Sequence, residues 1–253
     1  MSYRTMLSGI VNLNKGESED YFKEKLHEWM KINRWEYRDA DPINIPSKQF
    51  VQNNAAYIGS AVFHPEYSNS SKPEVNRRYF LSRIWEPNLP IMTVLMMNPS
   101  SANELVGDAT VDFVMEYARE HGFGTLFVVN TSSVIKGSKT TIDDFPRDPN
   151  NWFYIQYAIN RAELVILGWG ENGRDFAVPI LQSNYKFKDF LEGNFKKLHV
   201  FGYGDENSRR PYPKHPHPQV VKQRFPLDHA LTKVTPYMLE KIVKEKLVRK
   251  RND

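Results

Sequence analysis

Short apolar runs that alternate with helical patterns constrain the fold of this chain more than any other feature. The run at residues 91–97, IMTVLMM, is apolar at almost every position, as expected for a strand covered on both faces. Strands that alternate with helices predict an α/β fold, a three-layer sandwich with a mostly parallel central sheet flanked by helices. The expected strands lie at residues 77–85, 91–97, 125–129, 164–167 and 198–201, and the expected helices at 111–120, 151–161, 175–182 and 188–195.

The chain is predicted to divide near residue 75. Ser18 can cap a helix whose apolar face lies within residues 22–30, so residues 1–75 are expected to form an α-rich N-terminal extension. Residues 66–76 are polar and read as a linker. Residues 76–253 are expected to form the α/β domain, closed by a helix that begins at Pro236.

Composition excludes several kinds of chemistry. The 253 residues contain no cysteine, which rules out disulfides, a thiol nucleophile, Cys-ligated zinc and iron–sulfur clusters. The apolar runs are too short to span a bilayer, and the first residues lack the pattern of a signal peptide. We therefore expect a cytoplasmic protein with no membrane partner. The sequence identifies no protein partner, and a monomer is expected.

Polar motifs follow three of the expected strands. They are MMNPSSA at residues 96–102, FVVNTSSVIKG at 127–137 and KHPHPQVV at 214–221. Ligands of open α/β sheets bind at the carboxyl ends of the strands, so one site built from three distant loops is expected. The net charge is +4, and basic residues bracket the third motif, which favours a phosphate-bearing partner.

The order of these motifs resembles the uracil-DNA glycosylase superfamily. MMNPSSA, FVVNTSSVIKG, VILGWG and HPHPQVV stand in the superfamily's order over residues 91–221. The arrangement also looks like a bacterial and phage branch of unknown function with NPS and HP motifs. The resemblance implies a uracil-DNA glycosylase-like fold and an enzyme that flips a nucleotide out of DNA into a pocket. It implies no cofactor and no metal.

The resemblance assigns catalytic roles to three residues. Asn98 matches the position that orients the attacking water; Asn98-Pro99 could instead be a turn that ends a strand, but the functional role is favoured. His215 matches the histidine that donates a hydrogen bond to the departing base. Asp108 is a nearby carboxylate that can support the water or cap the helix near Val111, and capping is favoured.

Other residues are expected to hold the base or the DNA. Asn130 matches the position that reads the base edge, or it bonds locally at a strand end. Ser100 stands where the uracil-removing branch has a tyrosine that blocks large pyrimidines, so the pocket is expected to admit a larger base. Further base-binding candidates are Phe113, His217 and Trp169, although the core is favoured for Trp169. The DNA-binding candidates are Ser101, Arg209, Arg210, Lys214, Gln219 and Lys222.

Two further features of the last motif bear on its role. Gln219 stands where the uracil-removing branch has a leucine wedge, so any intercalation would be polar. His215 and His217 are one residue apart and could also be metal ligands. Because the chain lacks cysteine and an HExxH pattern, no metal is expected.

The sequence thus favours a monofunctional DNA glycosylase that acts on a modified pyrimidine and leaves an abasic site. Hypermodified or glucosylated cytosine in phage DNA, removed as antiviral defence, fits the open position at Ser100. The alternatives are a uracil-DNA glycosylase of base-excision repair, an inactive nucleic-acid-binding module, and an enzyme that acts on free nucleotides.

Overall fold

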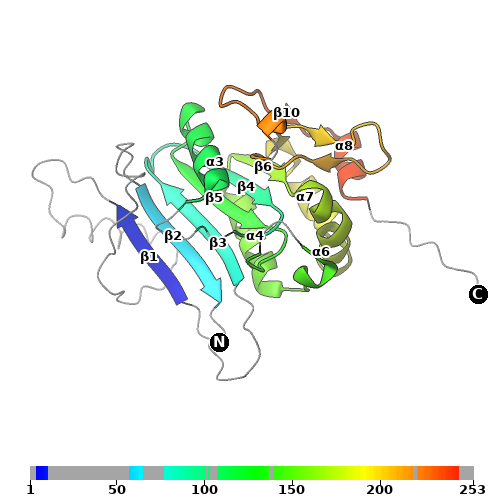
Figure 1. The fold of residues 1–253 in the computed structure, drawn as a ribbon, viewed down its shortest axis with the longest axis horizontal. Helices are drawn as coiled ribbons and strands as arrows, with labels where there is room; N and C mark the ends of the chain where they lie inside the picture. Colours follow the sequence, from blue (N-terminus) through cyan, green and yellow to red (C-terminus); the bar gives the residue numbers. More distant parts are fainter. Residues whose placement is uncertain are drawn as a thin grey trace, which may run out of the picture.

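A computed structural model describes residues 4–10, 57–64, 77–100, 102, 107–136, 140–218 and 221–244. Its main feature is an eight-stranded sheet in the order β1-β2-β3-β5-β4-β6-β7-β10 (Figure 1). The strands are β1 (Arg4–Ile10), β2 (Tyr57–His64), β3 (Arg77–Ile84), β4 (Ile91–Met96), β5 (Thr125–Asn130), β6 (Leu164–Gly168), β7 (Leu198–Val200) and β10 (Thr232–Lys233). A separate pair joins β8 (Tyr203–Gly204) to β9 (Tyr212–Pro213).

The centre of the sheet is parallel, as predicted. Strands β5, β4, β6 and β7 run in the same direction. The neighbouring pairs β1–β2, β2–β3 and β3–β5 on one side, and β7–β10 on the other, are antiparallel. Two strands from the expected N-terminal extension, β1 and β2, are hydrogen-bonded into this sheet, so the sheet crosses the boundary predicted at residue 75. The helix predicted within residues 18–30 lies outside the described residues.

The helices begin where capping residues occur. Asp108 caps α3 by accepting hydrogen bonds from the backbone N–H groups of Thr110 and Val111, at 2.9 and 2.8 Å. The helices are α3 (Ala109–Glu120), α4 (Pro149–Arg161), α5 (Gly170–Asn172), the π-helical turn η2 (Gly173–Ala177), α6 (Val178–Tyr185), α7 (Phe187–Gly193) and α8 (Pro236–Ile242), with short 3₁₀ turns at η1 (Ile142–Asp144), η3 (Phe195–Lys197) and η4 (Val221–Gln223).

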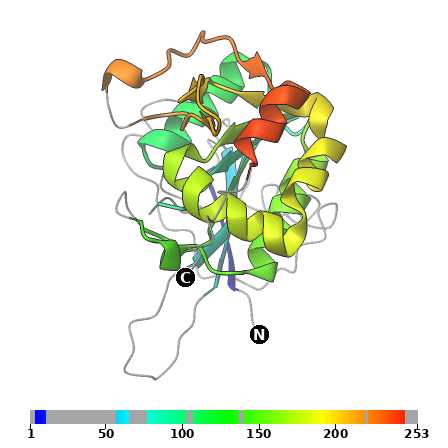
Figure 2. The same cartoon turned by 90° about the vertical axis from the view of Figure 1, so that its right-hand side faces the viewer.

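The two faces of the sheet carry separate cores, which gives the molecule three layers. Helix α3 covers one face and packs on side chains such as Val94, Met96 and Val128. Helices α4, α6, α7 and α8 cover the other face, where Leu95 and Val129 point. The helices at the right of Figure 1 face the viewer in Figure 2. No helix in the described ranges is long and apolar enough to cross a membrane.

The order of the parallel strands creates one natural ligand-binding position. The chain passes from β4 outward to β5, then returns across β4 to β6. Crevices at the carboxyl ends of strands form where the strand order reverses in this way. That position lies at the ends of β4, β5 and β6, where Met96 pairs with Asn130 on one side and with Gly168 on the other.

Candidate active site at the carboxyl edge of the sheet

The segments that follow β4 and β5 run side by side beyond the sheet. The backbone N–H of Thr131 donates to Met96 O at 2.8 Å, and that of Ser132 donates to Met97 O at 2.9 Å. Asn98 adds a side-chain link, because its Nδ2 donates to the backbone oxygen of Lys136. The first two sequence motifs are therefore brought together, and the part of the chain that is described offers no partner to Asn98 Oδ1.

Asp108 joins the start of α3 to the loop after β4. Its Oδ1 accepts the two helix N-terminal amides, and its Oδ2 accepts a hydrogen bond from the Ser100 hydroxyl. The favoured prediction for Asp108, helix capping, is confirmed. Ser100 is thus turned toward α3 and is partly buried.

The His-Pro segment packs directly on the end of β6. Gly168 has no side chain, and a Cβ there would lie 2.7 Å from Pro216 Cδ and 3.4 Å from the backbone oxygen of Lys214. The backbone N–H of Lys214 donates to Gly202 O at 2.9 Å and fixes the segment to the end of β7. The third motif thus reaches the same edge of the sheet as the other two.

Both histidines of this segment favour the neutral ring. Desolvation lowers the pKa of His215, and the carboxylate of Asp108 partly offsets this. Desolvation and Arg224 lower the pKa of His217, and Asp108 again opposes them. The Asp108 charge acts on both rings, so the start of α3 lies near the His-Pro segment.

The geometry also indicates which nitrogen of His215 carries the proton. The backbone N–H of His217 donates to Nδ1 of His215 at 3.3 Å. In a neutral imidazole the nitrogen that accepts is unprotonated, so Nε2 carries the hydrogen and is a donor. The ring of Phe113 on α3 lies 5.4 Å from the ring of His217, so the predicted base-stacking residue is next to the segment.

Asn130 ends β5 and is almost completely buried, with 1% of its surface exposed. Its Oδ1 accepts a hydrogen bond from the guanidinium of Arg78 at 3.4 Å, while its Nδ2 is buried without a partner in the described structure. Arg78 was not among the candidate residues. A charged residue inside the strand pattern RRYFLSRIW was the signal that could have singled it out, because arginine is rarely buried.

Trp169 lies on the other face of the sheet. It is fully buried among the side chains that contact α4, α6 and α7, and its ring lies 5.7 Å from that of Phe187. It is a core residue, which is the placement that the sequence favours. Burial of the indole ring is energetically favourable, although its Nε1 finds no hydrogen-bond partner among the described residues.

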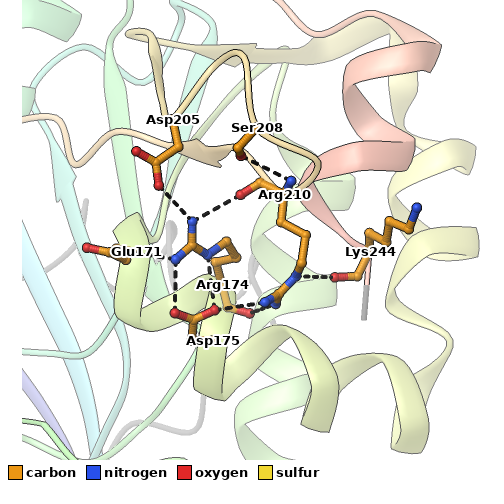
Figure 3. A network of polar contacts seen from close by, with 7 residues as sticks. All are labelled: Glu171, Arg174, Asp175, Asp205, Ser208, Arg210 and Lys244. Atoms are coloured by element: carbon orange, nitrogen blue, oxygen red, sulfur yellow. Dashed lines mark hydrogen bonds and ion pairs between the residues drawn. The ribbon is translucent and has the colours of Figure 1, made fainter. Parts of the chain in front are cut away.

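Arg210 is held within the protein, and its prediction as a DNA-binding residue is not supported. Its guanidinium donates to Asp175 Oδ1 at 3.0 Å, to the backbone oxygen of Arg174 at 3.1 Å and to that of Lys244 at 3.2 Å (Figure 3). In return, Arg174 donates to the backbone oxygen of Arg210 at 3.0 Å. This reciprocal arginine pair fixes the chain between β8 and β9 on η2.

The remaining DNA-binding candidates lie around the His-Pro segment or outside the described residues. Arg209 and Lys222 are exposed, and Lys214 is partly buried. Ser101 and Gln219 lie outside the described residues. Within those ranges, no three His, Asp or Glu side chains gather in a way that could hold a metal ion.

Replacing Gly168 with Ala is expected to displace the His-Pro segment. The new methyl group would meet the rigid ring of Pro216 at 2.7 Å, so the segment must move outward, and overpacking of this kind costs about 1–3 kcal/mol. Thermal unfolding measures the cost, and the histidine resonances in NMR spectra report the displacement. Gly193→Ala is the control, because a Cβ there meets no atom within 4 Å. Equal stability and unchanged resonances in both variants would contradict the proposed packing.

The comparisons with known proteins give a family and no relative of known activity. No curated protein and no solved structure matches the chain significantly. One family model, described as "Protein of unknown function (DUF1643)", matches residues 78–217. The match runs from the second residue of β3 through β9 and includes the first two polar motifs and the first half of the third. The match covers more than half of the 253 residues. The chain therefore belongs to the DUF1643 family.

Proposed function

We propose that the protein is a monofunctional DNA glycosylase that flips out a modified pyrimidine and hydrolyses its N-glycosidic bond. The observation that carries the proposal is the convergence of three polar motifs on one edge of the sheet, with Asn98, Asn130 and His215 on adjoining segments. Water would add to the sugar carbon, the bonding electron pair would leave with the base, and the proton lost by the water would pass to the departing base or to solvent. Such a reaction needs an oriented water, a reader of the base and a hydrogen-bond donor for the leaving group.

Asn98 is suited to orient the water. Its Nδ2 donates to two backbone oxygens, Pro99 O at 3.2 Å and Lys136 O. These two hydrogen bonds fix the orientation of the amide. Its Oδ1 can then accept a hydrogen bond from a water molecule. An amide cannot take up a proton, so Asn98 would position the water without acting as a strong base.

His215 is suited to stabilise the departing base. A neutral imidazole with its hydrogen on Nε2 donates to an oxygen on which negative charge develops, and it does so in a partly desolvated place where such a bond is strong. His217 and Phe113 lie beside it and would form part of the wall against which the base stacks.

The proposed substrate is a pyrimidine that carries a substituent. Ser100 is small, and its hydroxyl is bound to Asp108, which leaves no large side chain at this position to exclude a substituent. Hypermodified cytosine of phage DNA is such a base, and its removal would serve antiviral defence. Exposed Arg209 and Lys222, with Lys214, would contact the DNA phosphates.

The test is base release from DNA that contains one defined base. The protein is incubated with oligonucleotides that carry uracil, 5-hydroxymethylcytosine or glucosylated 5-hydroxymethylcytosine, and alkali then cleaves the strand at any abasic site. We expect cleavage with at least one of the modified cytosines and loss of cleavage in Asn98→Ala, which should still bind DNA. Selective release of uracil would overturn the substrate assignment. Binding without release from any base would leave a nucleic-acid reader in place of an enzyme.

A further inference from the structure

Arg78 is a buried cation without a carboxylate partner among the described residues. Only 1% of its surface is exposed, and its guanidinium donates to the backbone oxygen of Ala102 and to Asn130 Oδ1. Desolvation lowers its pKa to about 10, and the nearby carboxylate of Asp108 only partly offsets this. Burial of a charge without a direct ion pair is costly, and strongly perturbed buried groups of this kind cluster at functional sites. The position of Arg78 therefore requires an explanation beyond packing.

A β-bulge directs Arg78 to the candidate site. Along the β2–β3 pairing, Val62 lies opposite Phe80 but Phe63 lies opposite Arg78, so Tyr79 is an extra residue on β3. Tyr79 and Phe80 both pack on the face that carries α4. The next residue, Arg78, then contacts Ala102 in the core beneath α3, which is the face of Asn130 and Asp108. Bulges beside active sites redirect side chains in this way.

Two unused hydrogen-bond donors remain at this place. Arg78 Nε and Asn130 Nδ2 are both buried without a partner in the described structure. They belong to neighbouring groups, because the other end of the guanidinium is hydrogen-bonded to the other end of the same amide. Unpaired buried donors are destabilising, and a ligand with acceptor atoms would recover that cost.

We propose that Arg78 and Asn130 together form a donor-only reader of the flipped base, which selects cytosine-type bases over uracil-type bases. This inference rests on the proposed glycosylase function and deepens it. Arg78 is the specificity-determining residue: it occupies the amide oxygen of Asn130, and its cationic group beside that oxygen disfavours any N–H donor of the ligand there.

The chemistry of the pyrimidine edge explains the selection. Cytosine carries two adjacent acceptors, O2 and the unprotonated N3. In uracil and thymine N3 carries a hydrogen, so every adjacent pair of groups on that edge includes a donor. A donor-only reader would face this N–H with another N–H, and both would stay unpaired. Sites built on buried polar groups reject such mismatched ligands strongly.

The test compares two bases with the same substituent. 5-Hydroxymethylcytosine and 5-hydroxymethyluracil differ only in the edge that the reader would contact. Each is placed opposite a tetrahydrofuran abasic analogue, so that neither base is held by pairing. We expect release of the cytosine form to be at least about 100-fold faster in kcat/KM. Equal rates, or faster release of the uracil form, would overturn the inference while leaving the glycosylase proposal intact.

A variant pair assigns the preference to Arg78. Arg78→Met keeps much of the side-chain volume but removes the donors, and the preference is expected to fall below about 10-fold. Arg83→Met is the matched control, because Arg83 is equally buried on the same strand, where it stacks over Tyr57 and donates to the backbone. Arg83→Met should keep the full preference. A preference that survives Arg78→Met in a folded protein contradicts the assignment.

A binding measurement separates this inference from the proposed reaction. Fluorescence anisotropy of Asn98→Ala with the same two oligonucleotides needs no turnover. If no base is released from any DNA, the proposed reaction is wrong. The anisotropy measurement still shows whether the protein prefers the cytosine form over the uracil form. Tighter binding of the cytosine form, lost in Asn98→Ala/Arg78→Met, supports the donor-only reader, and equal binding overturns it.

Discussion

Replacing His215 with Asn is expected to slow base release by about 100-fold to 1000-fold while DNA binding stays within a factor of a few. The Asn side chain can place its oxygen near the position of Nδ1 and still accept the backbone N–H of His217. It has no group at the position of Nε2, so the donor for the departing base is lost. Single-turnover rates and anisotropy on the same oligonucleotide measure the two effects.

Gln at the same position makes the experiment specific. Its amide nitrogen can reach the position of Nε2, so His215→Gln is expected to recover at least about 10-fold of the rate lost in His215→Asn. A purely structural role for His215 predicts the opposite order, because Gln loses the local hydrogen bond that Asn keeps. His121→Asn, at the far end of α3, controls for loss of an imidazole elsewhere and should keep the full rate.

Replacing Arg174 with Met is expected to lower the free energy of unfolding by about 2–3 kcal/mol, which in a domain of this size lowers Tm by about 5 °C or more. The Arg174 side chain is 10% exposed and forms ion pairs with Asp175 at 2.9 Å and Asp205 at 3.1 Å. Its hydrogen bonds with Asp175 raise its pKa, so it stays charged. Because the carboxylates of Asp175 and Asp205 are partly exposed, the expected loss of unfolding free energy lies at or below the lower end of the range for fully buried ion pairs.

The loss should reach beyond the pair itself. Arg174 also holds the backbone of Arg210, so its removal frees the chain that leads through β9 to the His-Pro segment (Figure 3). Differential scanning calorimetry measures the change in Tm. Arg209→Met is the control, because this neighbouring arginine is exposed, and its removal should change stability by less than about 0.5 kcal/mol. A similar Tm in both variants would contradict a stabilising role for the arginine pair.

Local signals predicted much of the α/β domain. Pro236 is the first residue of α8, as predicted, and Thr235 caps the helix by accepting the backbone N–H of Met238. The continuously apolar run of β4 is buried on both faces, and the parallel pairing of β4 with β5 and β6 follows from the alternation with helices. These features depend on residues close in sequence, which is why patterns could find them.

Features that depend on distant pairing were missed. The sequence of β2, YIGSAVFH, holds the weak strand formers Gly59, Ser60 and Ala61, and only its pairing with β3 identifies it as a strand. Arg78 was missed because simple alternation from Phe80 places it on the α4 face, and the bulge at Tyr79 reverses that. The partners of Arg210 likewise come from η2 and from Lys244, which no spacing connects to it.

The position of β4 has a consequence for how the protein is made. Both neighbours of this innermost strand, β5 and β6, follow it in the chain, so a ribosome delivers β4 long before its hydrogen-bonding partners. Until Gly168 emerges, one edge of the most apolar strand stays open, and open apolar edges invite aggregation. The same residue then pairs with Met96 and supplies the surface on which Pro216 rests, so the candidate site can form only after the last parallel strands are in place.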